Sequence, residues 1–119
     1  MSATGAEQAA RDAYIRVPAT SPNFSDARSK MAWSYQADGD SKTALALITQ
    51  AAFANPNDRD IAITYADLLR ANDRYTEAAE VLDGLVAAEE PNPDWRLLYM
   101  RGVALERAGR WPEAERDLM

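Results

Sequence analysis

The chain has 119 residues, and its 13 Lys and Arg against 19 Asp and Glu give a formal net charge of −6. It contains no Cys and no His, which excludes thiolate nucleophiles, disulfides, Cys/His zinc sites and Ser-His-Asp triads. The acidic balance argues against a nucleic-acid partner, because neutralising phosphates requires clustered Lys and Arg. Apolar residues make up 47% of the chain and are dominated by alanine, with no sustained alternation of period two, so we expect helices and no sheet.

The first predicted helix spans residues 6–17, and Pro18 bounds it. Its apolar residues fall on one face at helical spacing: Ala6, Ala10, Ala13, Tyr14 and Val17. Ala10 lies 34 residues before Ala44, so residues 1–24 are interpreted as a tail and a degenerate half-repeat that caps the chain. The N-terminus lacks the basic start and apolar core of a signal peptide. No apolar run reaches the roughly 18 residues that span a bilayer, so we expect no membrane insertion.

Residues 25–58 form the next predicted unit, a pair of helices over residues 25–37 and 42–54. Ser25 is the expected N-cap of the first of these helices. Gly39 lies in the turn between them, where it can take a positive φ.

Two further units follow, over residues 59–94 and 95–119. The first has predicted helices at 59–71 and 76–88, with Asp58 or Asp60 at the helix start, where a carboxylate suits the dipole. The second begins with a helix near Asp94, an N-cap candidate, which ends near residue 108 before a C′ glycine, Gly109. A last, short helix begins around Pro112 and is cut off at residue 119.

The turns between paired helices repeat one phrase, in which a polar turn leads to a small residue that opens a new helix. The three alanines that close the phrase, Ala44, Ala78 and Ala114, lie 34 and then 36 residues apart. This period, and the pattern W-x2-L-G-x2-Y followed by A-x3-F and P, is that of the tetratricopeptide repeat. The matching residues are Arg28, Met31, Ala32, Tyr35, Ala44, Ile48 and Pro56; then Ala62, Tyr65, Ala66, Leu69, Ala78 and Leu82; then Leu98, Arg101, Gly102, Leu105, Ala114 and Leu118.

The chain therefore resembles three tandem tetratricopeptide repeats over residues 25–119. The resemblance implies an all-α, right-handed superhelical solenoid of antiparallel helix pairs, with about seven helices and the last one truncated. Small residues in the middle of the first helices and early in the second helices allow the paired helices to approach closely. Arg28 and Arg101 depart from the pattern, because they occupy places where the family has apolar residues.

In this family the first helices line a concave groove, and the second, fifth, ninth and twelfth residues of each repeat face it. The resemblance places these residues there: Asp26, Ser29, Trp33 and Gln36; Asp60, Ile63, Asp67 and Arg70; Arg96, Tyr99, Val103 and Glu106. The expected peptide-binding residues among them are Trp33, Ile63, Asp67, Arg70, Arg96, Tyr99 and Glu106. The alternative is that the aromatic residues pack inside the protein. The two interpretations carry equal weight for Trp33, and packing is favoured for Tyr99.

Some family members hold acidic C-termini with a clamp of Lys, Asn and Arg side chains. The residues at the clamp places here are Ser29, Trp33, Thr64, Arg96 and Met100. Only Arg96 fits, so we expect no clamp.

The leading functional hypothesis is a protein–protein interaction scaffold that binds a peptide or helix of a partner, with no catalysis, cofactor or metal. The alternative is self-assembly into a homo-oligomer through the incomplete last repeat, where Trp111, Leu118 and Met119 are the candidate residues. An enzyme is disfavoured because no carboxylate pair stands in a recognisable pocket context. RNA binding by a related helical repeat is disfavoured by the acidic balance. The composition is similar to that of bacterial proteins with long tetratricopeptide arrays, several of them exported. The sequence leaves the compartment open: the cytoplasm, or the periplasm if the chain is part of an exported protein.

Overall fold

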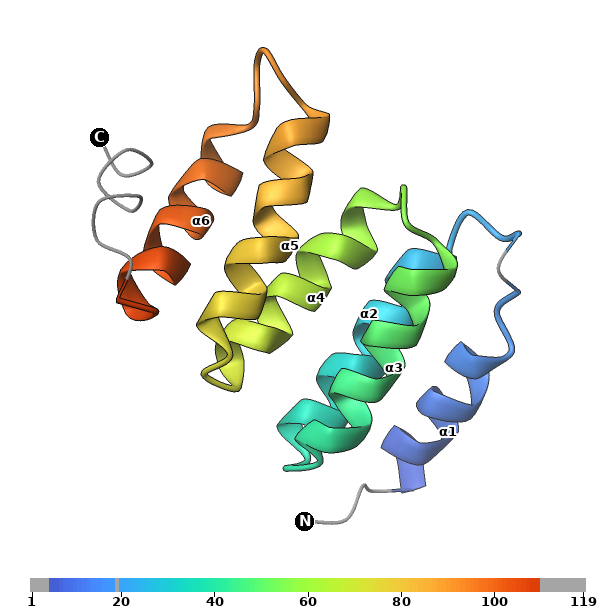
Figure 1. Ribbon diagram of the computed structural model, residues 1–119. Coiled ribbons are helices and arrows are strands. Elements are labelled where there is room, and N and C mark those ends of the chain that lie inside the picture. The colour runs from blue at the N-terminus through green and yellow to red at the C-terminus, as the bar shows by residue number, and fades with distance from the viewer. Residues whose placement is uncertain (1–4, 19, 110–119) are drawn as a thin grey trace. The chain divides into compact units, whose positions relative to one another are not determined.

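The computed structural model describes residues 5–18 and 20–109, and within these ranges every regular element is a helix (Figure 1). In chain order the helices are α1 (Gly5–Ile15), α2 (Phe24–Ala37), α3 (Ser41–Ala54), α4 (Arg59–Ala71), α5 (Tyr75–Ala88) and α6 (Trp95–Arg107). The all-α expectation is confirmed, and the predicted bounds of these helices hold to within two residues. The predicted last helix lies outside the described residues. No helix in the described ranges is long and apolar enough to cross a membrane.

The chain divides into two compact units, residues 1–64 and 65–119, and the division falls inside α4. In the first unit, α1 packs against α2, and α2 packs against α3. In the second unit, α5 packs against α6. Each pair α2–α3 and α5–α6 is joined by a short connection that reverses the chain (Figure 1). The α2–α3 pair is the helical hairpin of the first predicted repeat, whereas α5–α6 joins the second helix of one predicted repeat to the first helix of the next.

Alanine and glycine lie at the helix contacts in both units. Ala32 and Ala44 are fully buried in the first unit, and Ala66, Ala78 and Gly102 are buried in the second. Because these side chains are so small, the helix backbones approach closely, and larger apolar side chains fill the space beside them. The larger side chains that are almost completely buried are Ile48, Ile61, Leu68, Leu69, Leu82 and Leu97. The small-residue pattern of the sequence therefore marks the core correctly at these positions.

The turns after the first helices share a left-handed residue at the same place in each repeat. Gly39 has φ +86° and Gly109 has φ +83°, as the sequence predicts. Asp73 takes φ +61° at the equivalent place in the second repeat, which has no glycine. A non-glycine residue is strained in this region, although Asp is among those that tolerate it best.

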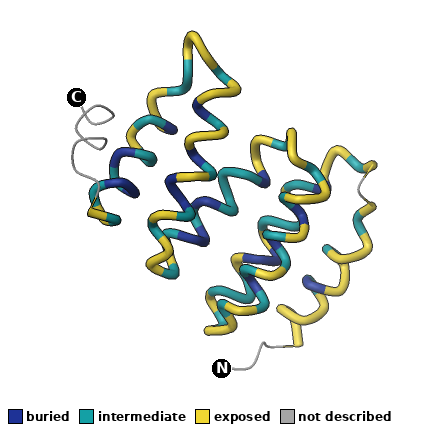
Figure 2. The backbone as a smooth tube through the Cα atoms, in the orientation of Figure 1, coloured by how far each residue is buried: buried dark blue, intermediate teal, exposed yellow. Residues whose placement is uncertain are grey.

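The predicted apolar face of the first helix is met only in part: Ala10, Tyr14 and Val17 are half-buried, whereas Ala6 and Ala13 are exposed. Most of α1 is exposed (Figure 2), and its one buried residue is Arg11, with 4% of its surface exposed. Its Nε donates to Ser34 Oγ at 2.9 Å and its Nη2 donates to the Ser34 carbonyl at 3.0 Å. Its Nη2 also lies 3.7 Å from Asp38 Oδ2. A charged side chain thus takes part in attaching α1 to α2, a contact that the apolar pattern did not indicate.

Carboxylates cap three helices. Asp40 accepts from the Thr43 N–H at 3.2 Å at the start of α3, and Asp94 accepts from the Arg96 N–H at 2.9 Å at the start of α6. Asp58 accepts from the Ile61 N–H at 3.1 Å at the start of α4. These contacts satisfy backbone donors that the first turn of a helix leaves without a partner.

The expectation that Ser25 caps α2 is wrong. The N-cap residue is Asn23, which forms no side-chain capping bond. Ser25 lies within the first turn, and its hydroxyl donates to Asp58 Oδ2 instead. The hydroxyl is used to connect α2 to the start of α4, a contact that local sequence rules do not consider.

Candidate functional site

A hollow of about 260 Å³ opens on the first unit between α2 and the start of α4. Its lining residues are Asp26, Ser29, Asp60, Ile63 and Thr64. Four of the five are residues that the repeat pattern assigns to the groove. They come together because the second and fifth residues of a repeat lie about one turn apart on one helix face.

Two side-chain hydrogen bonds hold the walls of this hollow together. Ser29 Oγ and Thr64 Oγ1 are 2.9 Å apart, and one turn earlier Ser25 donates to Asp58. Both contacts join α2 to α4 within the first unit. Because Ser29 and Thr64 bond to each other, the remaining polar groups that the hollow presents are the two carboxylates of Asp26 and Asp60.

The electrostatic character of the hollow is acidic. Asp26 forms an ion pair with Lys30 at 3.1 Å, and its side chain is 68% exposed. An exposed pair of this kind contributes little and exchanges easily for another cation. Hydrogen bonding to Asp26 raises the pKa of Lys30. Ile63 supplies the apolar wall, and Trp33 is 39% exposed one turn beyond Ser29 on α2.

In the second unit the predicted residues of α6 present an exposed aromatic surface. Tyr99 is 57% exposed, so the favoured interpretation that it packs inside the protein is wrong. Trp95, one turn earlier, is 68% exposed, and the guanidinium carbon of Arg96 lies 5.7 Å from the centroid of its ring. Glu106 is half-buried near the end of the helix.

Asp67 and Arg70 form an ion pair on α4, with Oδ1 and Nη2 3.3 Å apart. Burial raises the pKa of Asp67, and the positive charge of Arg70 opposes this shift only in part. Nε of Arg70 is buried and has no hydrogen-bond partner among the described residues. The pair is thus incompletely satisfied inside its own unit.

Sequence reasoning did not select Trp95 or Phe53, which is 78% exposed on α3. Trp95 lies next to Arg96 but is not among the residues that the repeat pattern assigns to the groove, so the pattern did not identify it. The self-association candidates Trp111, Leu118 and Met119 lie outside the described residues. Within the described residues no group of three potential metal ligands is clustered.

Residues 35–101 match the family model of the tetratricopeptide repeat, which is more than half of the chain. The chain belongs to the tetratricopeptide repeat family. No curated protein matches the sequence. Among solved structures, the fold is similar to that of the MamA RS-1 ArsTM double mutant, with a TM-score of 0.73 and 19% sequence identity. The match covers 95% of this chain and 62% of that one, so the chain spans less than two thirds of its length.

The family match and the all-helical structure, with its likeness to this solved fold, define the fold as a tetratricopeptide-like helical repeat. Repeats of this family generally mediate protein–protein interaction. The chain therefore belongs to a class of repeat proteins whose general role is protein–protein interaction.

Proposed function

We propose that this chain binds a peptide or helix of a partner protein along its first helices, and that it performs no chemistry of its own. The observation that carries the proposal is the hollow beside Ile63, which holds the carboxylates of Asp26 and Asp60. A basic side chain next to an apolar one fits this combination, because the carboxylates attract the cation and Ile63 gives the apolar group a dry contact.

The chain's net charge of −6 supports a basic partner, since the field of the whole protein favours its approach. Within the described part of the chain, Asp60 forms no ion pair, so its charge is available to a ligand. The second unit, taken by itself, exposes aromatic area at Trp95 and Tyr99, of the kind that supplies binding energy at protein interfaces. Arg96 and the Asp67–Arg70 pair lie on α6 and α4, two of the three helices that the groove prediction uses.

The test is selection from a phage-displayed library of random peptides, followed by measurement of the selected peptides with purified variants. We expect the selected sequences to place Arg or Lys beside an apolar residue. The double variant Asp26→Asn/Asp60→Asn should weaken their binding by about tenfold or more, because two charge-assisted contacts are lost. The matched control is Asp12→Asn, an exposed carboxylate of α1 that bonds to Gln8 and does not line the hollow.

Two results would contradict the proposal. One is a selection that enriches acidic peptides or that enriches no peptide at all. The other is equal binding by the double variant and the control, which would place the ligand elsewhere. Binding should also weaken as salt is raised from low to physiological concentration, because exposed charges are screened.

A further inference from the structure

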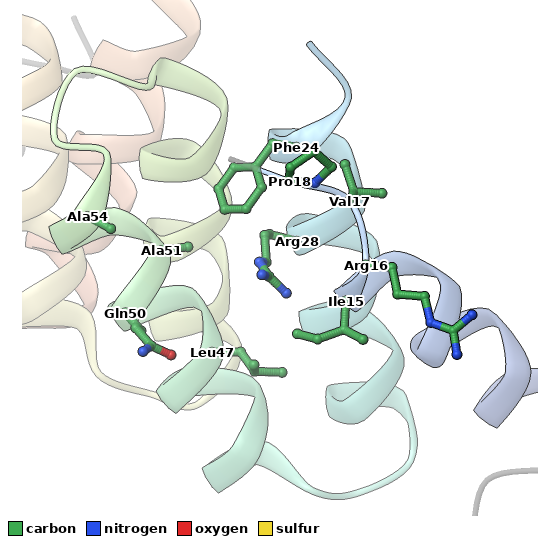
Figure 3. Close-up of a pocket in the computed structure, with 10 residues that line it drawn as sticks. All are labelled: Ile15, Arg16, Val17, Pro18, Phe24, Arg28, Leu47, Gln50, Ala51 and Ala54. Carbon is green, nitrogen blue, oxygen red and sulfur yellow. The ribbon is translucent and has the colours of Figure 1, made fainter. Parts of the chain in front are cut away.

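A second and larger pocket lies in the first unit, among the end of α1, the loop after it, α2 and α3 (Figure 3). Its volume is about 370 Å³, and its surface is about equally polar and apolar, with Ile15, Val17, Phe24 and Leu47 among the apolar side chains. Its size falls at the low end of small-molecule sites, which span about 300–1,000 Å³. The pocket shares no lining residue with the acidic hollow.

The charged lining residues of this pocket are both arginines, in a chain with a surplus of acids. Arg28 projects among the apolar side chains, whereas the guanidinium of Arg16 is turned away from them at the rim (Figure 3). No carboxylate lines the pocket. The charge of this pocket is therefore positive, whereas the hollow proposed for the partner peptide is negative.

The guanidinium of Arg28 has only weak partners among the described residues. It lies 4.9 Å from the centroid of the Phe24 ring, and its Nη1 is 3.9 Å from Met31 Sδ. Neither contact neutralises the charge. By comparison, Arg11 lies beside Asp38 and Arg101 lies 3.1 Å from Asp83.

Arg28 is also one of the two residues that depart from the repeat pattern, which has a large apolar side chain at this place. An apolar residue would complete the packing among Phe24, Leu47 and Ile15, whereas arginine adds a half-buried charge without a carboxylate. Such a charge is costly in apolar surroundings unless an anion accompanies it.

We propose that this pocket binds a small apolar monocarboxylic acid, with its hydrocarbon part against Ile15, Phe24 and Leu47 and its carboxylate on Arg28. A guanidinium binds a carboxylate through two parallel hydrogen bonds, which fixes the orientation of the ligand. A single cation matches a single negative charge, and the apolar walls are unsuited to a strongly hydrated dianion such as phosphate. The amide of Gln50 at the edge offers a further polar contact.

The experiment is a titration of the full chain followed by methyl signals of Ile15, Val17 and Leu47 in NMR spectra. The probes are 4-methylpentanoate and phenylacetate, each compared with its neutral amide. We expect saturable shifts at these methyl groups, with the acids binding about tenfold more tightly than the amides, as one charge-assisted contact predicts. No saturable shift, or equal binding of acid and amide, would overturn the proposal.

Arg28→Met tests the carboxylate contact directly. Methionine restores an apolar side chain of similar length, so the variant should fold at least as stably as the wild type, which thermal unfolding checks. We expect it to bind acid and amide alike. Lys42→Met is the matched control, and it should keep the preference for the acid because Lys42 is an exposed cation of α3 that does not line the pocket. A preference that persists in Arg28→Met would refute the assignment.

A further arm uses a peptide that ends in leucine with a free carboxylate, since this chain end has the same chemistry. The free acids should shift the methyl signals at concentrations no higher than this peptide requires. Tighter binding of the peptide would overturn the small-molecule assignment. Asp26→Asn/Asp60→Asn should leave acid binding unchanged, so this inference and the proposed function fail independently.

Discussion

The guanidinium carbon of Arg11 lies 4.0 Å from the centroid of the Tyr35 ring, and Arg11 is the buried residue of α1. The ring covers one face of the guanidinium. At the edge of the guanidinium, Ser34 accepts a hydrogen bond and Asp38 supplies a negative charge. The contact places a charged residue where a helical repeat normally has apolar ones. The attachment of α1 to α2 therefore includes a buried charged contact.

Arg11→Met should therefore loosen α1 without removing the core of α2 and α3. Removing one partner of a buried, hydrogen-bonded charge costs about 3 kcal/mol, and here most of that loss should appear as local opening of α1. Amide hydrogen exchange along α1 measures it. Arg16→Met, which alters an exposed arginine of the following turn, is the control and should leave exchange unchanged. Equal protection of α1 in both variants would contradict the prediction.

The sequence predicted the features of the fold that recur in every repeat. The spacing of Ala44 and Ala78 set the register, and that register identified the buried small residues and four of the five residues that line the acidic hollow. Helix bounds followed from Pro and Gly positions. These features depend on local spacing, which one sequence displays fully.

The contacts that the sequence did not reveal are between side chains far apart in the chain. Arg11 reaches Ser34 and Ser25 reaches Asp58, and neither contact leaves a periodic signal. Arg28 was recognised only as a departure from the repeat pattern. Its pocket became visible once the end of α1 was placed beside α3.

The turn residue Asp73 offers a stabilising substitution. Asp73→Gly removes the strain of a left-handed conformation, an effect of up to about 1 kcal/mol that the greater freedom of glycine in the unfolded chain partly offsets. The reverse change, Gly39→Ala, forces a Cβ into the same region and should destabilise by about 1 kcal/mol. Urea unfolding of both variants measures the difference. A loss of stability in Asp73→Gly would show that the contacts of the Asp73 side chain stabilise the fold by more than its left-handed backbone conformation costs.

Asp73 also affects the pKa of the Tyr75 hydroxyl. Tyr75 OH donates to Asp73 Oδ1 at 2.8 Å, and this hydrogen bond raises the pKa of Tyr75. In Asp73→Gly the pKa of Tyr75 should therefore fall toward the ordinary tyrosine value. The tyrosine ring signals in NMR spectra recorded across an alkaline pH series report it. An unchanged Tyr75 titration would exclude this hydrogen bond as the cause.

Asp67 and Asp40 should give stability a pH dependence of opposite sign. Burial raises the pKa of Asp67, so its contribution is most favourable at low pH and is lost as pH rises through the raised value. Hydrogen bonding to Thr43 lowers the pKa of Asp40, so its contribution is present above the ordinary aspartate pKa and is lost as pH falls through the lowered value.

Asp67→Asn should accordingly be more stable than the wild type at neutral pH, and the difference should disappear in acid, where Asp67 is protonated. Asp40→Ala should be less stable at neutral pH, and part of its deficit should disappear in acid. Urea unfolding at a series of pH values compares the two variants with the wild type. A neutral-pH loss of stability in Asp67→Asn would mean that the Arg70 pair outweighs the burial of the carboxylate.

Asp58 combines two roles that a double-mutant cycle can separate. Its Oδ1 caps α4 through the Ile61 N–H, and its Oδ2 accepts from Ser25 of α2. Asp58→Ala should cost about 1–2 kcal/mol, because both the cap and the contact between helices are lost. Ser25→Ala removes only the second contact and should cost less.

The double variant Ser25→Ala/Asp58→Ala should be less destabilised than the sum of the single variants, because both remove the same hydrogen bond. The difference measures the connection between α2 and α4 that forms one end of the acidic hollow. If the two single effects add without a remainder, Asp58 acts as a helix cap alone. The hollow would then depend on the Ser29–Thr64 contact for its shape, and Ser29→Ala should weaken peptide binding more than Ser25→Ala does.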